Sequence, residues 1–247
     1  WWKAVYNFRF RLIKKGDKVK KFKYSMLSLP RCGSNWVRYW FEYFSNENTS
    51  EKNVLVEKNH WGVERTTDTT ATLYKRHKLS QEDIEGREIQ KLVLIVRDYR
   101  ECFVRHCVGK KFARRVGRMK DFTDNLYTYD SFQGEKMIMY YEDFVSDPKT
   151  YMKQFLDFVD APNDWENIDV AEHRELSVKL YETGGSEKVG SQTKGAPSLT
   201  KGKADFKFHQ KELDEETKQQ LEEWFQTEHP KLHDEYLARY KLGVLES

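Results

Sequence analysis

The stretch from Phe22 to Phe44 constrains this chain most, because its pattern changes from strand to helix within a few residues. Tyr24 to Leu29 is a short apolar run typical of a buried strand, and a turn of composition Pro-Arg-Cys-Gly follows it. From Trp36 to Phe44, apolar residues recur at helical spacing. A strand that enters a helix through a glycine-containing turn indicates an α/β fold, in which helices cover a parallel sheet.

Such a turn suits an anion. Its backbone N–H groups and the positive end of the following helix point at one place, which favours a phosphate. Arg31 adds a forked guanidinium, and Ser34 or Asn35 can cap the helix. Most turns of this kind in parallel sheets bind nothing, but the concentration of Arg, Gly, Ser and Asn before Trp36 favours a binding loop. The pattern GxxxxGK[ST] of nucleotide-binding loops is absent.

The length and net charge of the chain limit the number of domains and the classes of partner that it can have. A chain of 247 residues can bury a substantial core, and we expect one domain over residues 1–247. The formal net charge is only +3, so the chain as a whole is not a polyanion binder. Basic residues are nevertheless clustered in an aromatic and basic arm (1–21) and between Lys110 and Lys120. Such runs usually form a solvated face; a groove for anionic ligands is the sharper alternative.

Cysteine content and hydropathy indicate the cellular compartment in which the protein is expected. The three cysteines have no framework spacing, so we expect reduced thiols, and no Cys/His cluster indicates a metal site. No apolar run approaches the length that spans a membrane, and no signal peptide is visible. These patterns predict a cytoplasmic protein.

Further strands are expected at Val54–Lys58, Leu92–Val96 and Lys136–Tyr141. The polar residues Glu64–Lys78 are expected to form a loop or lid, and helices are expected after Ser80 and Pro148 and within Leu213–Tyr240. The predicted fold class is therefore α/β, with three layers and a central, mostly parallel sheet flanked by helices.

The residues LPRCGSNW, Leu29 to Trp36, resemble the phosphosulfate-binding loop of sulfotransferases. These enzymes use 3′-phosphoadenosine-5′-phosphosulfate (PAPS) as donor, release 3′-phosphoadenosine-5′-phosphate (PAP) and have a P-loop-NTPase-like fold. The resemblance implies that Trp36 stacks on adenine and that the loop residues hold the donor, namely Arg31, Cys32, Gly33, Ser34 and Asn35.

Lys58-Asn59-His60 resembles the Lys-Thr-His that follows a strand in cytosolic-type sulfotransferases. The resemblance implies that His60 is the general base, and that Lys58 and Arg31 stabilise the group in transfer. A lone histidine is more often structural than catalytic, which is the plain alternative for His60.

The segment Arg97 to Glu101, followed by a helix, resembles the family's 3′-phosphate-binding segment, so Arg97 is expected to bind that phosphate. The family's serine eight residues later is replaced by Arg105, which can hold the same phosphate. An ion pair of Arg97 with Asp98 or Glu101 is the alternative.

Two more segments complete the resemblance. Tyr141 opens a Tyr-Glu-Asp that resembles the adenine-holding strand end of the family. Residues 184–205 are rich in glycine and basic residues, and Lys201 and Gly202 resemble a mobile loop that closes over the 3′-phosphate. By composition alone this segment is a flexible linker.

Together these matches predict a sulfotransferase that moves a sulfuryl group, in line, from PAPS to a hydroxyl or amine of a small-molecule or glycan acceptor. No metal and no nucleic-acid partner are expected. A nucleotide kinase or other phosphoryl transferase is one alternative. A non-enzymatic nucleic-acid-binding protein that uses the basic arm and the run from Lys110 to Lys120 is the other.

Overall fold

The computed structural model describes residues 21–34, 36–37, 40–41, 73–107, 111–161, 169–171 and 213–241, and the backbone alone of 56–58. Several sequence predictions lie outside these residues. They concern most of the basic arm, the closing loop at 184–205, and the site residues Asn35, His60, Lys201 and Gly202.

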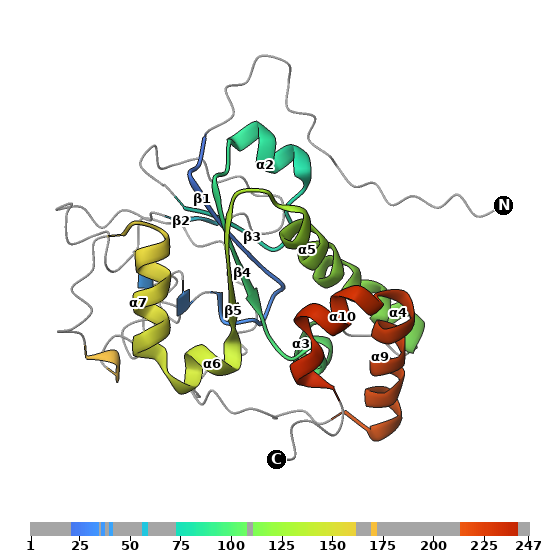
Figure 1. Ribbon diagram of the computed structural model, residues 1–247. Helices are drawn as coiled ribbons and strands as arrows, with labels where there is room; N and C mark the ends of the chain where they lie inside the picture. The colour runs from blue at the N-terminus through green and yellow to red at the C-terminus, as the bar shows by residue number, and fades with distance from the viewer. Residues whose placement is uncertain are drawn as a thin grey trace, which may run out of the picture.

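The described strands form one parallel sheet in the order β2-β3-β1-β4-β5 (Figure 1). The strands are β1 (Tyr24–Ser28), β2 (Val56–Lys58), β3 (Leu73–Arg76), β4 (Lys91–Val96) and β5 (Glu135–Tyr140). The parallel α/β architecture predicted from the sequence is confirmed.

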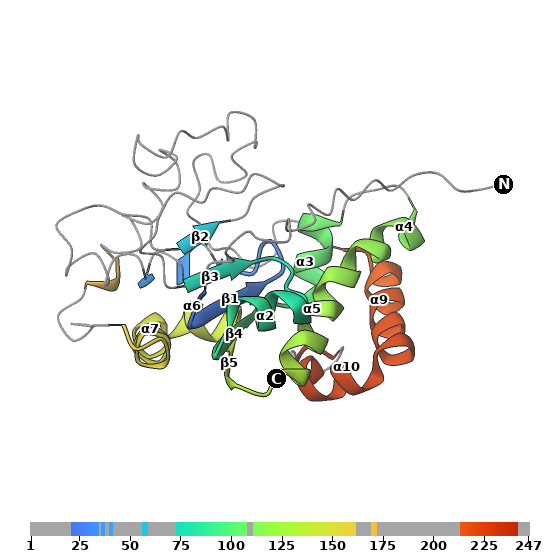
Figure 2. The ribbon, with the colours of Figure 1, turned by 90° about the horizontal axis from the view of Figure 1, so that it is seen from above.

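Helices cover both faces of this sheet (Figures 1 and 2). On one face lie α7 and the helical residues 36–37 and 40–41, which meet where Trp40 packs on Phe155. On the other lie α2, α3 and α5, with α9 and α10 packed outside them. The helical segments are α2 (Gln81–Arg87), α3 (Tyr99–His106), α4 (Phe112–Val116), η1 (Gly117–Met119), α5 (Lys120–Ser131), α6 (Tyr141–Ser146), α7 (Pro148–Phe158), α9 (Glu215–Glu228), α10 (Pro230–Tyr236) and η3 (Ala238–Tyr240).

The strand order places a switch point at β1. The described helical residues after β1, 36–37 and 40–41, lie on one face of the sheet, whereas α2, α3 and α5, which lie between β3 and β4 and between β4 and β5 in the chain, lie on the other face. In open parallel sheets, ligands bind outside the carboxyl ends of the strands at such a switch point. The loop after β1 occupies that place.

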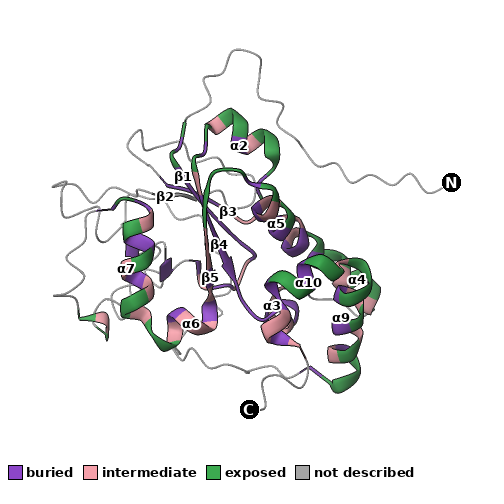
Figure 3. Cartoon of the chain, in the orientation of Figure 1, coloured by how far each residue is buried: buried purple, intermediate pink, exposed green. Residues whose placement is uncertain are grey.

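The core follows from the sequence pattern (Figure 3). Every residue of β1 and the apolar run of β4 from Leu92 onward are buried, as expected of strands covered on both faces. Helix ends also form as predicted. Ser80 and Asp83 make a reciprocal capping box at α2, and Asp214 caps α9.

The prediction of a loop over Glu64–Lys78 is wrong for its last part, because residues 73–76 form strand β3, which pairs with β1. The sequence LYKR reads as polar, yet Lys75 is buried (1% exposed). A long aliphatic stem can lie within a sheet when the ammonium reaches a polar partner, and that partner is described below.

Candidate functional site

The loop that joins β1 to the next helix bends through two residues with left-handed backbone. Arg31 has φ of 82° and Gly33 has φ of 79°. A Cβ on Gly33 would lie 2.7 Å from Tyr141 Cδ2 and 2.9 Å from Phe144 Cζ, so only glycine fits there without displacement. The helix begins at once, because the amide of Trp36 donates to the Gly33 carbonyl at 2.9 Å. This geometry is the concave turn that the sequence predicted.

Arg97 holds this loop from the neighbouring strand β4. Its Nη1 donates to the Arg31 carbonyl at 2.9 Å, and its guanidinium lies 4.0 Å from the centre of the Tyr141 ring. The side chain also pairs with Glu101 at 3.2 Å, the ion pair considered as the alternative above. Arg97, Arg31 and Tyr141 follow three adjacent strands and meet at one edge of the sheet.

Arg105 joins the same group through Glu101. Its Nε donates to Glu101 Oε2 at 2.7 Å, and Arg97 Nη2 donates to that same oxygen. The two arginines, eight residues apart in sequence, therefore share one carboxylate, which is 5% exposed. Among the described residues, two guanidinium groups therefore meet one carboxylate, so these three side chains carry a net positive charge, which favours an anion.

Two thiols lie beneath the loop. The sulfur atoms of Cys32 and Cys102 are 3.5 Å apart, and both side chains are fully buried. Burial and then the Cys32 sulfur raise the pKa of Cys102 well above its usual value. The two cysteines do not form a disulfide, and Cys32 acts here as a small apolar contact between the loop and α3.

Trp36 lies in an aromatic cluster on the first helix. It is 5% exposed, with ring centroids 5.1 Å from Trp40 and 5.9 Å from Phe144. Ser34 is also buried at the start of the helix. The stacking of Trp36 on adenine stays a prediction.

The structure brings a lysine and a histidine to the other side of the loop that the sequence analysis did not single out. Lys75 on β3 places Nζ 2.8 Å from His77 Nε2, and His77 Nδ1 lies 2.9 Å from the Ser28 carbonyl at the end of β1. Since a carbonyl only accepts, Nδ1 carries the proton and Nε2 carries a lone pair. The Lys-x-His spacing was present in the sequence, but it fell in the segment read as a loop.

Helix α5 fixes the chain on either side of His77. The Asn125 amide donates to the His77 carbonyl at 2.9 Å, and Thr128 Oγ1 donates to the Leu79 carbonyl at 3.1 Å. Lys78 also reaches Asp121 and Asp124 on the same helix. The imidazole is therefore held in place by a preformed element rather than by a loose loop.

The structure says less about the predicted pair Lys58 and His60, because it describes only the backbone of Lys58 and does not describe His60. Lys58 ends β2, the edge strand that β3 separates from β1. Two strand spacings put it on the order of 10 Å from β1. His60 lies outside the described residues. The structure therefore places Lys75 and His77, rather than Lys58, beside the loop.

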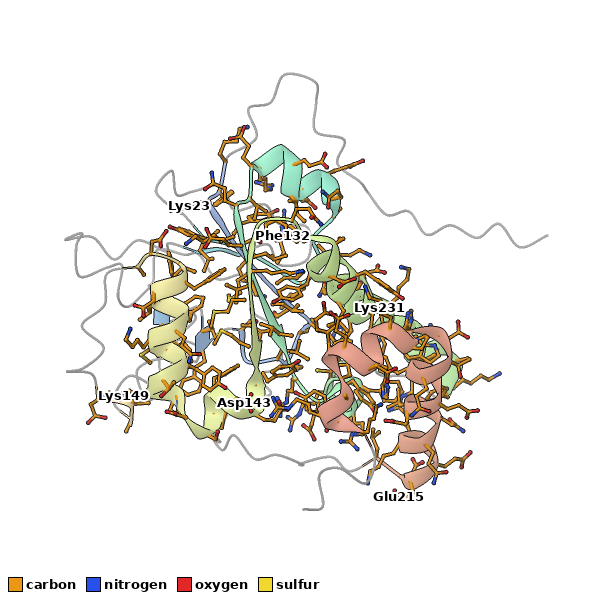
Figure 4. The ribbon with its side chains drawn as sticks, in the orientation of Figure 1. Lys23, Phe132, Asp143, Lys149, Glu215 and Lys231 are labelled. Atoms are coloured by element: carbon orange, nitrogen blue, oxygen red, sulfur yellow. The ribbon has the colours of Figure 1, made fainter. Side chains whose placement is uncertain are left out.

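Glu142 ties the ends of β4 and β5 together. Its carboxylate accepts from the Asp98 amide at 3.1 Å and from the Tyr240 hydroxyl at 2.6 Å. Burial raises the pKa of Glu142. Next to it, Asp143 binds both terminal nitrogens of Arg239, at 2.6 and 2.7 Å (Asp143 is labelled in Figure 4). Both acids of the Tyr-Glu-Asp segment thus hold the frame of the site.

Comparisons with known proteins name no relative: no protein-family model matches the chain, and no curated protein matches it. In the described ranges no group of three or more His, Cys, Asp or Glu side chains is arranged to hold a metal ion. None of the helices in that part of the chain has the length and apolar character needed to cross a bilayer.

Proposed function

We propose that this chain is a PAPS-dependent sulfotransferase with a P-loop-like fold, which transfers a sulfuryl group to a hydroxyl or amine of an acceptor. The observation that carries the proposal is the loop after β1. It lies at the switch point of a parallel sheet, bends through Arg31 and Gly33, and is held by Arg97 from the next strand. The resemblance of residues 29–36 to the phosphosulfate-binding loop supports the same function.

In this proposal the loop amides and Arg31 hold the 5′-phosphosulfate, and Tyr141 and Trp36 contact adenine. Arg97 and Arg105 bind the 3′-phosphate. A guanidinium has five N–H donors, and the buried Nε of Arg97 has no hydrogen-bond partner among the described residues. Lys201 and Gly202 then close over the nucleotide and exclude water.

We assign the general base to His77 in preference to His60. Its Nδ1–H donates to the Ser28 carbonyl, so Nε2 can accept the acceptor's proton. Lys75 Nζ now lies 2.8 Å from Nε2 and 3.1 Å from Nδ1, so this assignment requires the ammonium to release Nε2 when the donor binds. The acceptor oxygen or nitrogen then attacks sulfur, the bond from sulfur to the phosphate oxygen breaks, and PAP leaves with the electron pair.

The test is a transfer assay by mass spectrometry with PAPS and a mixed acceptor library, combined with calorimetry of PAP binding. His77→Ala is expected to lower transfer by about 10²–10⁴-fold while the PAP affinity changes little. His60→Ala is measured beside it, and His229→Ala, at the junction of α9 and α10, is the control for loss of an imidazole. Loss of transfer in His60→Ala with full activity in His77→Ala would return the role to His60.

The 3′-phosphate contact is tested separately. Arg105→Gln is expected to weaken PAP by about 10–100-fold, because a hydrogen bond to a charged group contributes about 1.5–3 kcal/mol. Adenosine 5′-monophosphate, which lacks that phosphate, should be nearly unaffected. If the unmodified chain gave no heat with PAP, the proposed function would be overturned. Protection from thermal unfolding by ATP-Mg²⁺ but not by PAP would favour a phosphoryl transferase.

A further inference from the structure

A row of basic side chains runs along α4 and η1, beyond the carboxyl end of α3. Lys111, Arg114, Arg115 and Arg118 are spaced i, i+3, i+4 and i+7, the spacing of one helical face. We call these four residues the basic stripe. The other face packs inward, where Phe112 contacts Phe103 and Met119 is fully buried.

No carboxylate of the described residues forms an ion pair with the basic stripe, whereas several other surface lysines in the same part of the chain are paired. Lys23, Lys231 and Lys241 each form an ion pair with an aspartate, at 2.6, 2.6 and 2.9 Å. Within the described ranges, the stripe forms no ion pair at all. The reason is visible in the sequence, because no Asp or Glu occurs between Glu101 and Asp121.

Two nearby carboxylates have other partners. Asp121 pairs with Lys78, and Asp214 caps α9 through the amide and hydroxyl of Thr217. Arg115 is turned back toward α3, donating to the Cys107 carbonyl at 3.1 Å and stacking over Phe103 at 4.2 Å. Lys111, Arg114 and Arg118 are exposed. The stripe is thus anchored at Arg115 and open to solvent elsewhere.

The basic stripe is continuous with the proposed transfer site. Helix α3 begins just after Arg97 and ends at His106. Arg115 of the stripe packs on Phe103 of this helix at 4.2 Å and donates to the carbonyl of Cys107 just after the helix ends. The same helix carries Arg105, whose Nε donates to Glu101 at 2.7 Å. Helix α3 therefore connects the basic stripe to the cluster of Arg97, Glu101 and Arg105.

We propose that the acceptor is polyanionic, a sulfated or carboxylated polysaccharide, and that the basic stripe holds it beside the transfer site. This inference rests on the proposed function. The stripe spans about 10 Å from Lys111 to Arg118 at 1.5 Å per helical residue, so it can contact several anionic groups of one chain rather than a single phosphate. Release of counterions drives such binding and makes it strongly salt-dependent.

The structure favours a polysaccharide over a nucleic acid. Single-stranded nucleic acids are bound by stacking of bases on exposed aromatic side chains. Among the described residues the only exposed large hydrophobic side chain is Tyr127, which lies on α5 outside the stripe. Helix α4 has five residues, too few to read a major groove.

The test measures fluorescence anisotropy of a labelled chondroitin sulfate hexasaccharide at about 50 and about 200 mM salt. The variant Arg114→Glu/Arg118→Glu replaces two exposed cations by two anions. The matched control is Lys149→Glu/Lys153→Glu on α7, which covers the opposite face of the sheet (Figures 2 and 4). The stripe variant is expected to lose at least ~10-fold in affinity, with a salt slope shallower by about two, and the control less than about twofold.

The inference would be overturned if both variants lost the same affinity for the hexasaccharide, or if neither lost any. So would tighter binding of a labelled single-stranded DNA at the same salt, which would point to a nucleic acid instead. In a transfer assay with chondroitin, the stripe variant should raise KM and leave kcat nearly unchanged.

PAP calorimetry separates this inference from the proposed function. PAP binding by the stripe variant shows that it is folded and that any defect lies in acceptor binding. If PAP binds but the hexasaccharide does not, the donor site stands and the acceptor assignment fails. If PAP does not bind even the unmodified chain, the proposed function fails and the acceptor role of the polysaccharide fails with it.

Discussion

At the amino ends of the strands, Lys23 and Lys91 meet the carboxylate of Asp160 at 2.6 and 3.2 Å, and about half of the Lys23 and Asp160 side chains is exposed. At the carboxyl ends, Arg97 is 7% exposed and bonds to a backbone carbonyl as well as to Glu101. Lys23 and Asp143 mark these two ends in Figure 4.

The difference is one of solvent exposure: the ion pairs at the amino ends of the strands are exposed, and the ion pair of Arg97 at the carboxyl ends is buried. Water screens the amino-end ion pairs, so their contribution to stability is small. The carboxyl-end cluster is shielded from water, so its interactions are stronger and removal of one partner is costly. At the amino ends of the strands, the ion pairs link the starts of β1 and β4 to Asp160 at the surface. At the carboxyl ends, Arg97 fixes the position of the loop after β1.

The largest effect is expected from Gly33→Ala. The left-handed backbone and the contacts with Tyr141 and Phe144 together should lower the free energy of unfolding by about 2–5 kcal/mol. Urea denaturation measures this change. Gly86→Ala in α2 is the control, because a Cβ there meets nothing within 4 Å, and it should stabilise by about 0.5–1 kcal/mol. Equal changes of the same sign would show that the loop is not constrained.

A smaller loss is expected from Arg97→Gln. The Arg31 carbonyl and the buried Glu101 carboxylate lose a charged donor, which should cost about 2–4 kcal/mol. Lys23→Gln at the amino end removes an exposed cation and should leave the urea midpoint nearly unchanged. If the two variants unfolded at the same midpoint, the proposed contrast between the two ends would be wrong.

The smallest effect is expected at Asp160. Hydrogen bonds from Lys23 and then Tyr24 hold the pKa of its carboxyl well below the usual value of 3.8. A depressed pKa in the folded state means that the stabilisation is complete above pH ~4 and is lost as the pH falls further.

Asp160→Asn tests this pH dependence. Asparagine tolerates the left-handed backbone of this position, where φ is 50°. The variant should be less stable by under ~1 kcal/mol at pH ~7, and the difference should narrow toward pH ~3. Urea titrations at both pH values measure it, and a gap independent of pH would mean that the carboxylate charge contributes nothing.

Much of the fold could be predicted because local pattern and burial agree. The apolar run at 92–96 is found in β4, the turn after β1 has the glycine it needs, and Ser80, Pro148 and Asp214 begin helices as expected. These signals are local in sequence. Neighbouring residues are enough to produce them.

Strand β3 could not be predicted in this way, because its residues are held by tertiary contacts. In the sequence alone, Lys75 is typical of a surface residue. In the folded chain it is buried, because β3 pairs with β1 and the Lys75 ammonium hydrogen-bonds to His77. His77, the candidate general base, was not predicted for the same reason. Its position depends on tertiary contacts with Ser28 and Asn125, each more than forty residues away in sequence. The sharing of Glu101 by Arg97 and Arg105 was likewise not predicted.

The contacts of Glu142 and Asp143 bear on the order in which the site forms during synthesis. Tyr240 and Arg239 hold these two acids from almost one hundred residues further along the chain. Because the ribosome releases the sheet first, a nascent chain can pair its strands before the ends of β4 and β5 are tied together. Because Glu142 and Asp143 gain these contacts only after residues 239–240 of η3 have emerged, the carboxyl ends of β4 and β5 become fixed late in synthesis.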